Sequence, residues 1–395
     1  MRFPRIFSLL LAALLLAGCG SAPAEPTSTA ETLSPETLPP AESVPAETEA
    51  PVSELDALLE GMTLRQKVGQ LFIVRPEALD PASATALTDA MIDALEEYPV
   101  GGIILFSQNI TSPDQLAAYN EALQDFSEIP LFLSVDEEGG TVARLANNTA
   151  FDLSRYKNAA SIADAAQALE MGRTIGGYLN AYGFNMDFAP VADVNTNPQN
   201  PVIGTRAFSS DAETAAELAG AMADGLNEQG IIAVFKHFPG HGDTAEDSHS
   251  GIAVSHKTEA EMEICEWLPF LEAESGDCVM VGHIAAPEIT GSLIPATVSS
   301  EIVTGILKEK LGFQGLVITD SLSMGAITDV YTPGEAALGA LQAGCDILLL
   351  PADLQEAFNA VVSAVEDGSY SEEQLDETVR RILQFKAEHG ILCLE

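Results

Sequence analysis

The chain has 395 residues, 47% of them hydrophobic, and its 59 acidic and 17 basic side chains give a formal net charge of −42. This hydrophobic content supports a large core, so most of the chain is not a disordered acidic polymer. The negative charge repels nucleic acid and anionic lipid head groups, and we expect no nucleic-acid partner. It fits a neutral or cationic small ligand, or a locally basic pocket inside an acidic surface, unless the charge serves only solubility.

The first 18 residues have the pattern of a secretory signal peptide. Two arginines in MRFPRIF precede the apolar run SLLLAALLLAG, which is too short to span a membrane as a helix. The stretch LAGC at 16–19 resembles a bacterial lipoprotein signal, in which the cysteine is lipidated and becomes the new N-terminus. We therefore predict an extracytoplasmic protein anchored to the bacterial cell membrane through Cys19. The alternative is an ordinary secretory leader, or a short membrane anchor, with a chance cysteine.

Residues 19–52 are predicted to be a disordered tether between the lipid and a folded domain. Pro, Thr, Ser, Ala and Glu dominate this segment after Cys19, and large apolar side chains are almost absent. Such a segment buries too little surface to offset its ordering entropy. We expect a single folded domain over 53–395.

Within that domain, short apolar runs alternate with longer amphipathic segments. Eight runs have the composition and length of strands covered on both faces: 71–74, 101–106, 130–136, 184–193, 231–238, 278–284, 315–320 and 345–351. Helices are predicted at 83–97, 113–126, 162–181, 211–229, 258–275, 299–311, 334–343, 353–366 and 372–389. Ser112 and Thr332, each followed by proline, are typical helix N-caps.

This alternation predicts an α/β fold, a single-domain (β/α)8 TIM-type barrel. An open doubly wound sheet is the alternative, but no GxGxxG fingerprint follows the first strand. In such barrels the catalytic groups lie at the carboxyl ends of the strands. Polar residues gather at those ends here, which favours a shared site: Asp136, Glu137, Glu138, Asp193, Lys236, His237, His283 and Asp320.

Four cysteines follow Cys19 in the chain. Cys278 and Cys345 begin apolar runs, so they are expected to be buried rather than part of a disulfide framework. A bond between Cys265 and Cys278 stays open.

The stretch FKHFPGHGDTAEDSHSG at 235–251 holds three of the six histidines. One interpretation is a structural loop whose polar side chains bond its own backbone. A second is a metal site, because the stretch contains ligand types at His237, His241, Asp243 and His249. Proline and glycine after His237 prevent the helix on which a paired-histidine zinc site usually lies, so no metal is expected.

A third interpretation is acid/base catalysis. Asp247 and His249 are two residues apart, which places both side chains on one side of an extended segment. A carboxylate beside an imidazole fixes its tautomer and raises its proton affinity. Asp320, at the end of the apolar run GLVIT, is the candidate partner. A carboxylate opposite a proton donor is the arrangement of retaining glycoside cleavage.

Several motifs together resemble glycoside hydrolase family 3, most closely its bacterial β-N-acetylglucosaminidase branch. They occur in the order VDEEGGTVARL at 135–145, NPVIGTRAFS at 200–209, KHFPGHGDT at 236–244, DSH at 247–249 and TDSLSM at 319–324. The resemblance covers about 65–390. It implies that Asp320 is the nucleophile, that His249 is the general acid/base and that Asp247 is its partner. It also implies that the terminal N-acetylglucosamine is held by Asp136, Arg144, Arg206, Lys236 and His237.

The chain departs from the family pattern at two positions. Thr141 stands where arginine is frequent and Glu137 where glutamine is common, and both are expected to alter subsite contacts without changing the chemistry. Many family members have a second α/β domain with a glutamate acid/base. This chain ends at Glu395, so we expect the one-domain form in which a loop histidine takes that role.

The resemblance implies an exo-acting, retaining β-N-acetylglucosaminidase that needs no metal or organic cofactor. Its expected partner is a carbohydrate with terminal β-linked GlcNAc, such as a peptidoglycan fragment, and the chain is expected to be a monomer. Two alternatives stay open. One is a phosphorylase that uses phosphate in place of water on the same site. The other is a non-catalytic sugar-binding lipoprotein.

Overall fold

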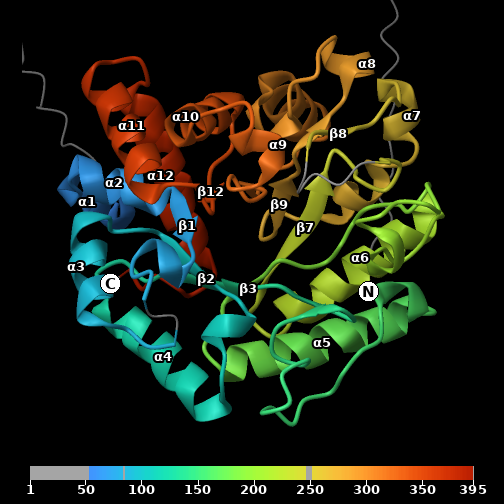
Figure 1. The fold of residues 1–395 in the computed structure, drawn as a ribbon, viewed down its shortest axis with the longest axis horizontal. Helices are drawn as coiled ribbons and strands as arrows, with labels where there is room; N and C mark the ends of the chain where they lie inside the picture. The colour runs from blue at the N-terminus through green and yellow to red at the C-terminus, as the bar shows by residue number, and fades with distance from the viewer. Residues whose placement is uncertain (1–52, 83–84, 246–250, 395) are drawn as a thin grey trace, which may run out of the picture. The chain divides into compact units, whose positions relative to one another are not determined.

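The computed structural model describes residues 53–82, 85–245 and 251–394 (Figure 1). The predicted signal peptide and tether with Cys19, and the predicted acid/base residues Asp247 and His249, lie outside the described residues. No helix among the described residues has the length and apolar character needed to cross a bilayer.

Eight strands form one parallel sheet that curls into a barrel, which confirms the predicted fold. Each predicted apolar run contains one of them: β1 (Phe72–Val74), β2 (Gly102–Leu105), β3 (Phe132–Val135), β6 (Met186–Asp187), β7 (Ile232–Phe238), β9 (Cys278–Val281), β11 (Leu316–Thr319) and β12 (Leu348–Leu349). The order in the sheet is β11-β9-β7-β6-β3-β2-β1-β12. A parallel bridge between Ile318 and Ile347 joins the first and last strands, so the barrel is nearly closed.

The barrel strands are buried along their whole length, since helices cover the outside and side chains fill the inside. The principal helices are α3 (Asp89–Glu97), α4 (Pro113–Phe126), α5 (Ala165–Ala181), α6 (Ala212–Asn227), α10 (Pro333–Ala343), α11 (Leu354–Glu366), α12 (Glu372–Glu388) and a π-helical segment at Glu301–Lys310. Figure 1 shows α5 and α6 side by side on the outer surface. Ser112 and Thr332 cap α4 and α10 with their side chains, as predicted.

Short strands and short helices also lie outside the barrel sheet. Strands β4 (Glu137–Gly139) and β5 (Val142–Ala143) form an antiparallel pair. Strands β8 (Ala253–Val254) and β10 (Ile284–Ala285) form a parallel pair. The short helices are α7 (Glu259–Glu263), α8 (Pro287–Thr290) and α9 (Gly325–Thr328).

The single helix predicted at 258–275 is wrong. The segment divides into α7 and a 3₁₀ turn at Leu268–Glu272. Pro269 lies in the first turn of that 3₁₀ segment, and proline has no N–H to continue a preceding helix. Trp267, between the two pieces, is fully buried.

Two helices that the sequence analysis did not predict precede the barrel, α1 (Glu54–Gly61) and α2 (Leu64–Gln70). Both contact α12. The buried Lys386 of α12 donates to Gln70 Oε1 at 2.8 Å and to the Gly101 carbonyl at 3.0 Å, just before β2. Burial lowers the pKa of Lys386 to about 7. These contacts lie at the amino ends of β1 and β2, at the opposite end of the barrel from the predicted site.

All four cysteines of the described residues are free thiols, and Cys278 and Cys345 are buried as predicted. The possible bond between Cys265 and Cys278 is therefore not formed in this structure.

Candidate active site

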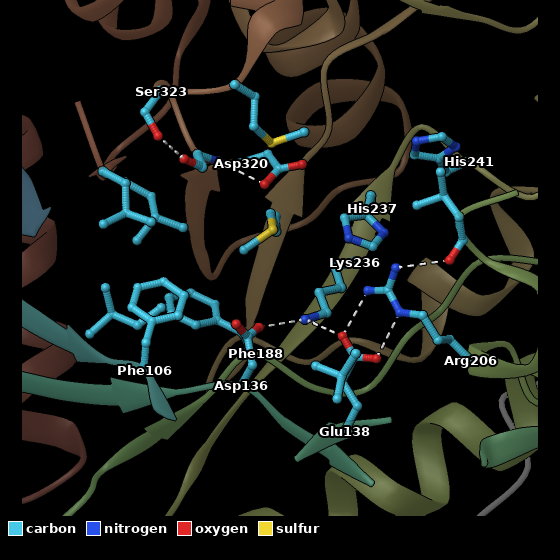
Figure 2. A pocket seen from close by; sticks show the side chains of 18 of the residues that line it. Phe106, Asp136, Glu138, Phe188, Arg206, Lys236, His237, His241, Asp320 and Ser323 are labelled. Carbon is cyan, nitrogen blue, oxygen red and sulfur yellow. Dashed lines mark hydrogen bonds and ion pairs between the residues drawn. The ribbon is translucent and has the colours of Figure 1, made fainter. Parts of the chain in front are cut away.

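A cavity of about 470 Å³ opens at the carboxyl ends of the barrel strands. It brings together six of the eight predicted site residues: Asp136, Arg144, Arg206, Lys236, His237 and Asp320. Phe106 and Phe188 form an apolar part of its wall, and Figure 2 shows Asp320 across the cavity from Asp136.

Asp320 directly follows β11. Its backbone N–H donates to the Val281 carbonyl at 2.9 Å, and its Oδ1 accepts the Ser321 N–H at 2.7 Å. Burial alone would raise the pKa of Asp320, but the electrostatic effect of the nearby His283 and His237 opposes it, and the resulting pKa lies below the ordinary value. Asp320 is therefore an anion at neutral pH, with one oxygen held and the other available to a ligand.

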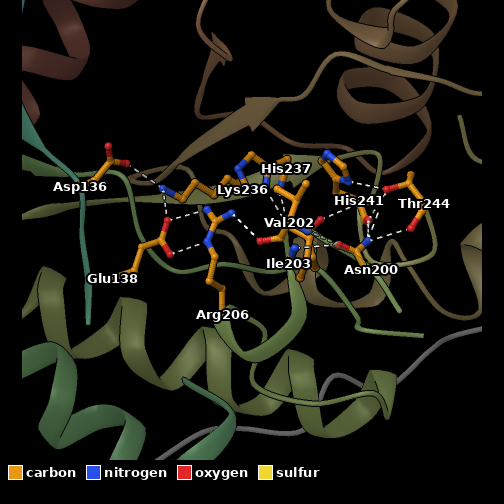
Figure 3. A network of polar contacts seen from close by, with 11 residues as sticks. Asp136, Glu138, Asn200, Val202, Ile203, Arg206, Lys236, His237, His241 and Thr244 are labelled. Atoms are coloured by element: carbon orange, nitrogen blue, oxygen red, sulfur yellow. Dashed lines mark hydrogen bonds and ion pairs between the residues drawn. The ribbon is translucent and has the colours of Figure 1, made fainter. Parts of the chain in front are cut away.

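Alternating charges line the opposite wall. Lys236 is only 2% exposed, and its ammonium lies 2.9 Å from Asp136 Oδ1 and 2.7 Å from Glu138 Oε1 (Figure 3). Arg206 meets Glu138 with two N–H groups, at 2.9 and 2.8 Å. Arg144 donates to Asp136 at 3.0 Å. Three cations against two carboxylates make this wall locally basic inside an acidic protein.

These pairings set the protonation states of the wall. Burial would raise the pKa of Glu138, but Lys236 and Arg206 lower it to about 2. Burial would likewise raise the pKa of Asp136, and Lys236 and Arg144 bring it below its ordinary value. Burial would lower the pKa of Lys236, yet Asp136 and Glu138 raise it. All these groups are charged at neutral pH and present a fixed set of donors and acceptors.

Glu138 was not among the predicted binding residues, although it joins Lys236 to Arg206. The sequence carried a signal for it, because Asp136 and Glu138 are two residues apart and such residues face the same side of an extended segment. Glu137, between them, turns away from the cavity. Neither Glu137 nor Thr141 lines the cavity, so any effect of these two residues on subsite contacts would be indirect and stays a prediction.

Glu137 instead stabilises the local backbone. It is fully buried and accepts the backbone N–H groups of Leu145 at 2.8 Å and Ala146 at 2.9 Å, and the Tyr178 hydroxyl at 2.8 Å. These bonds hold the turn that carries Arg144. The Glu137 N–H donates to Asp187 Oδ1 at 2.8 Å, whereas the buried Asp187 Oδ2 has no hydrogen-bond partner among the described residues.

His237 and the loop after it are positioned by Asp193, a fully buried carboxylate. Asp193 accepts the N–H of His237 at 3.2 Å, its ring Nδ1 at 2.7 Å, and the N–H of His241 at 2.6 Å. Burial would raise the pKa of Asp193, but His237 lowers it, so the carboxylate stays ionised. Because Asp193 takes Nδ1, a ligand in the cavity would meet Nε2 of His237.

A second anchor holds the loop that leads to the predicted acid/base residues. Asn200 donates from Nδ2 to the carbonyls of His241 at 2.8 Å and Thr244 at 3.1 Å (Figure 3). Its Oδ1 accepts the N–H groups of Val202 at 2.9 Å and Ile203 at 2.7 Å. Residues 246–250, with Asp247 and His249, begin two positions after Thr244.

In the described part of the loop, two of the residues with metal-ligand side chains bond to protein groups. His241 Nδ1 lies 2.6 Å from Thr244 Oγ1, and Asp243 accepts the Ser255 hydroxyl at 2.6 Å. Within 53–82, 85–245 and 251–394, no group of three His, Cys, Asp or Glu side chains could hold a metal ion.

Comparison with known families agrees with this geometry. The family model described as "Glycosyl hydrolase family 3 N terminal domain" matches residues 63–385. The chain belongs to glycosyl hydrolase family 3. The match covers every strand of the barrel and all the cavity residues described above.

The chain is also similar in sequence and structure to several named proteins. The chain is 35% identical to "Beta-hexosaminidase LpqI" of Mycobacterium tuberculosis, over 98% of both chains. It is 33% identical to "Beta-hexosaminidase A" of Pseudoalteromonas piscicida over 77% of its own length, and spans 56% of that relative. A solved family 3 β-N-acetylglucosaminidase from Paenibacillus sp. is 37% identical, with a TM-score of 0.79, over 84% of this chain and 63% of the other.

We expect Asn200→Ala to loosen the root of the loop at 239–245, because it removes five hydrogen bonds from a site only 8% exposed. Amide hydrogen exchange should show protection lost over this segment, with a loss of about 1–3 kcal/mol in the free energy of unfolding. Asn200→Asp is the matched variant, since it keeps the acceptor for Val202 and Ile203 and loses only the donor. Unchanged protection at 239–245 in both variants would refute the anchor.

Asp187→Asn is expected to stabilise the fold in a pH-dependent way. Burial raises the pKa of Asp187 well above its ordinary value. The folded state then binds the proton more tightly than the unfolded one, so this contribution to stability is complete below about pH 3.8 and is lost as the pH rises. The amide of the Asp187→Asn variant does not ionise, so the variant does not lose this stability as the pH rises. Thermal unfolding should show a gain of about 1 kcal/mol at pH 7 and none near pH 3.5.

The exposed Asp152 provides the control for this substitution. Asp152→Asn removes the same formal charge from the surface and should leave the unfolding temperature unchanged at both pH values. An equal effect of the two substitutions would mean that net charge, and not the buried carboxyl, is responsible.

Proposed function

We propose that this protein is an exo-acting, retaining β-N-acetylglucosaminidase that removes terminal β-linked GlcNAc from peptidoglycan-derived fragments. The observation that carries the proposal is the cavity itself. An ionised Asp320 stands on one side, and the charged wall of Asp136, Lys236, Glu138 and Arg206 on the other. The names of the relatives support this activity class.

The wall suits the hydroxyl groups of one terminal sugar. Asp136 can accept from a hydroxyl, while Lys236, Arg144 and Arg206 have N–H groups beyond those used in their ion pairs. His237 offers Nε2 beside them. Because these groups are already paired, they keep their positions before the sugar arrives, which reduces the cost of ordering them on binding.

Asp320 acts as the nucleophile in the first step. Its free oxygen attacks the anomeric carbon, the glycosidic C–O bond breaks, and His249 gives a proton to the departing oxygen. The Ser321 N–H holds the other carboxylate oxygen. The lowered pKa of Asp320 keeps it unprotonated, as a nucleophile must be.

Water completes the reaction. His249, now neutral and oriented by Asp247, takes a proton from water, whose oxygen attacks the anomeric carbon and releases Asp320. Two inversions give net retention of the β configuration. Inorganic phosphate in place of water would give the sugar 1-phosphate, so chromatography of the products in phosphate buffer separates hydrolysis from phosphorolysis.

The proposed setting is the extracytoplasmic side of the bacterial cell membrane. Lipidated Cys19 would anchor the chain, and residues 20–52 would let the barrel reach its carbohydrate substrate as a monomer. The pattern at 1–19 supports this setting.

Asp320→Ala tests the nucleophile. We expect kcat on an aryl β-GlcNAc to fall by more than about 10³-fold with the unfolding temperature little changed. Added azide should restore part of the rate and yield the α-glycosyl azide, which a merely structural role of Asp320 would not produce. Near-normal turnover without azide would exclude Asp320 as the nucleophile.

His249→Ala tests the acid/base group through the leaving group. An activated aryl leaving group needs little protonation, so its bond cleavage should slow far less than that of a natural disaccharide. The measurement is kcat/KM for both substrates in the variant and in the unaltered protein. Equal losses on the two substrates would remove His249 from the role of proton donor.

A further inference from the structure

A second hollow of about 370 Å³ adjoins the catalytic cavity. Three residues line both, Arg75, Ser323 and Leu350. The second hollow continues between the ends of β1 and β12 and the start of α11. We call it the aglycone hollow and define it by Arg75, Glu77, Tyr98, Ser323, Leu350 and Asp353.

The guanidinium of Arg75 has no counter-charge among the described residues. Arg75 directly follows β1, and its exposed side chain makes no hydrogen bond or ion pair with another described residue. The other Arg and Lys residues of the catalytic cavity, namely Arg144, Arg206 and Lys236, are each bound to a carboxylate. In a chain with a net charge of −42, an unpaired guanidinium between two cavities is a ready partner for an anionic group.

Glu77 supplies an acceptor in the same hollow. Its Oε1 accepts from Asn109 at 2.9 Å and from Gln108 at 3.4 Å. Its Oε2 is buried and has no hydrogen-bond partner among the described residues. A buried carboxylate oxygen without a donor is costly, so this atom is poised to accept from a hydroxyl or amide of a bound molecule.

The wall between the two cavities is conformationally strained. Leu350 has a φ of 50°, the one positive φ among the described non-glycine residues. Its N–H donates to the Ile73 carbonyl at 2.9 Å, which ties the end of β12 to β1. A left-handed backbone costs a non-glycine residue energy and is retained mostly at functional sites.

We propose that the aglycone hollow binds the part of the substrate beyond the scissile bond, and that Arg75 binds a carboxylate on it. The inference rests on the proposed function, which puts the anomeric carbon at Asp320. Ser321 and Ser323, whose hydroxyls lie 2.8 Å apart, line the cavity just after Asp320, and Ser323 lines the hollow too. The chain beyond the scissile oxygen therefore passes Ser323 toward Arg75.

The lining selects a ligand of mixed character. Glu77 and Asp353 repel a small free anion. The unpaired guanidinium of Arg75 binds a carboxylate more strongly than it binds a neutral group. A second sugar with a carboxylate substituent provides both features, since its hydroxyl or amide N–H can meet Glu77 while its carboxylate meets Arg75.

Substrate pairs that differ in one charge test this inference. GlcNAc-β-1,4-MurNAc bears a lactyl carboxylate, GlcNAc-β-1,4-GlcNAc does not, and an aryl β-GlcNAc lacks the second sugar. We expect Arg75→Gln to lower the ratio of kcat/KM for the anionic over the neutral disaccharide by about tenfold or more. Arg75→Lys should recover part of that ratio. Arg155→Gln, which removes an exposed cation outside both cavities, should leave it unchanged.

The outcomes separate the two proposals. An unchanged ratio in Arg75→Gln, with the aryl substrate still cleaved, overturns the role of Arg75 and leaves the proposed function standing. An equal drop of the ratio in Arg155→Gln also overturns it, because overall charge would then explain the effect. If the unaltered protein cleaves none of the three substrates, the proposed function fails and this inference falls with it.

Discussion

The buried ammonium of Lys236 is the contact on which the candidate site depends. A buried charge is tolerated only when it is paired, and Lys236 finds Asp136 and Glu138 on the segment after β3. The pairing fixes the end of β7 against that segment. Without the ammonium, Asp136 and Glu138 would keep only their arginine partners, Arg144 and Arg206, and the ion-pair link between the two carboxylates would be lost.

The same physical rule divides the buried carboxyl groups into two kinds. Asp136 and Glu138, which pair with Lys236 and an arginine, and Asp320, which lies near His283 and His237, have pKa values below the ordinary range and stay charged. Glu137 and Asp187 form no ion pair with a described residue, and burial raises their pKa values. Five acidic groups close together in space thus separate into a charged set that faces the cavity and a set that holds the framework.

The barrel could be predicted from the sequence because buried parallel strands leave a strong local pattern. Eight apolar runs of strand length are difficult to arrange otherwise, and polar residues at their ends indicate the rim. The role of Glu138 was within reach from its spacing to Asp136. The anchoring roles of Asp193 and Asn200 were not, because they act on backbone groups of a loop that lies 48 and 41 residues away in the chain, respectively. Contacts between segments so distant have no local signature.

Binding and loop position are joined through one short segment. Arg206 contacts Glu138 with its Nε and Nη2 and the Val202 carbonyl with its Nη1, at 3.2 Å. The N–H of Val202 in turn bonds to Asn200, which holds the carbonyl of Thr244 (Figure 3). The polar contacts therefore run without a break from the charged wall of the cavity to Thr244, which precedes the segment with the predicted acid/base residues by two positions. A displacement of Arg206 must strain this path, so the wall that would bind the sugar and the root of the loop that would protonate its leaving group form one mechanical unit.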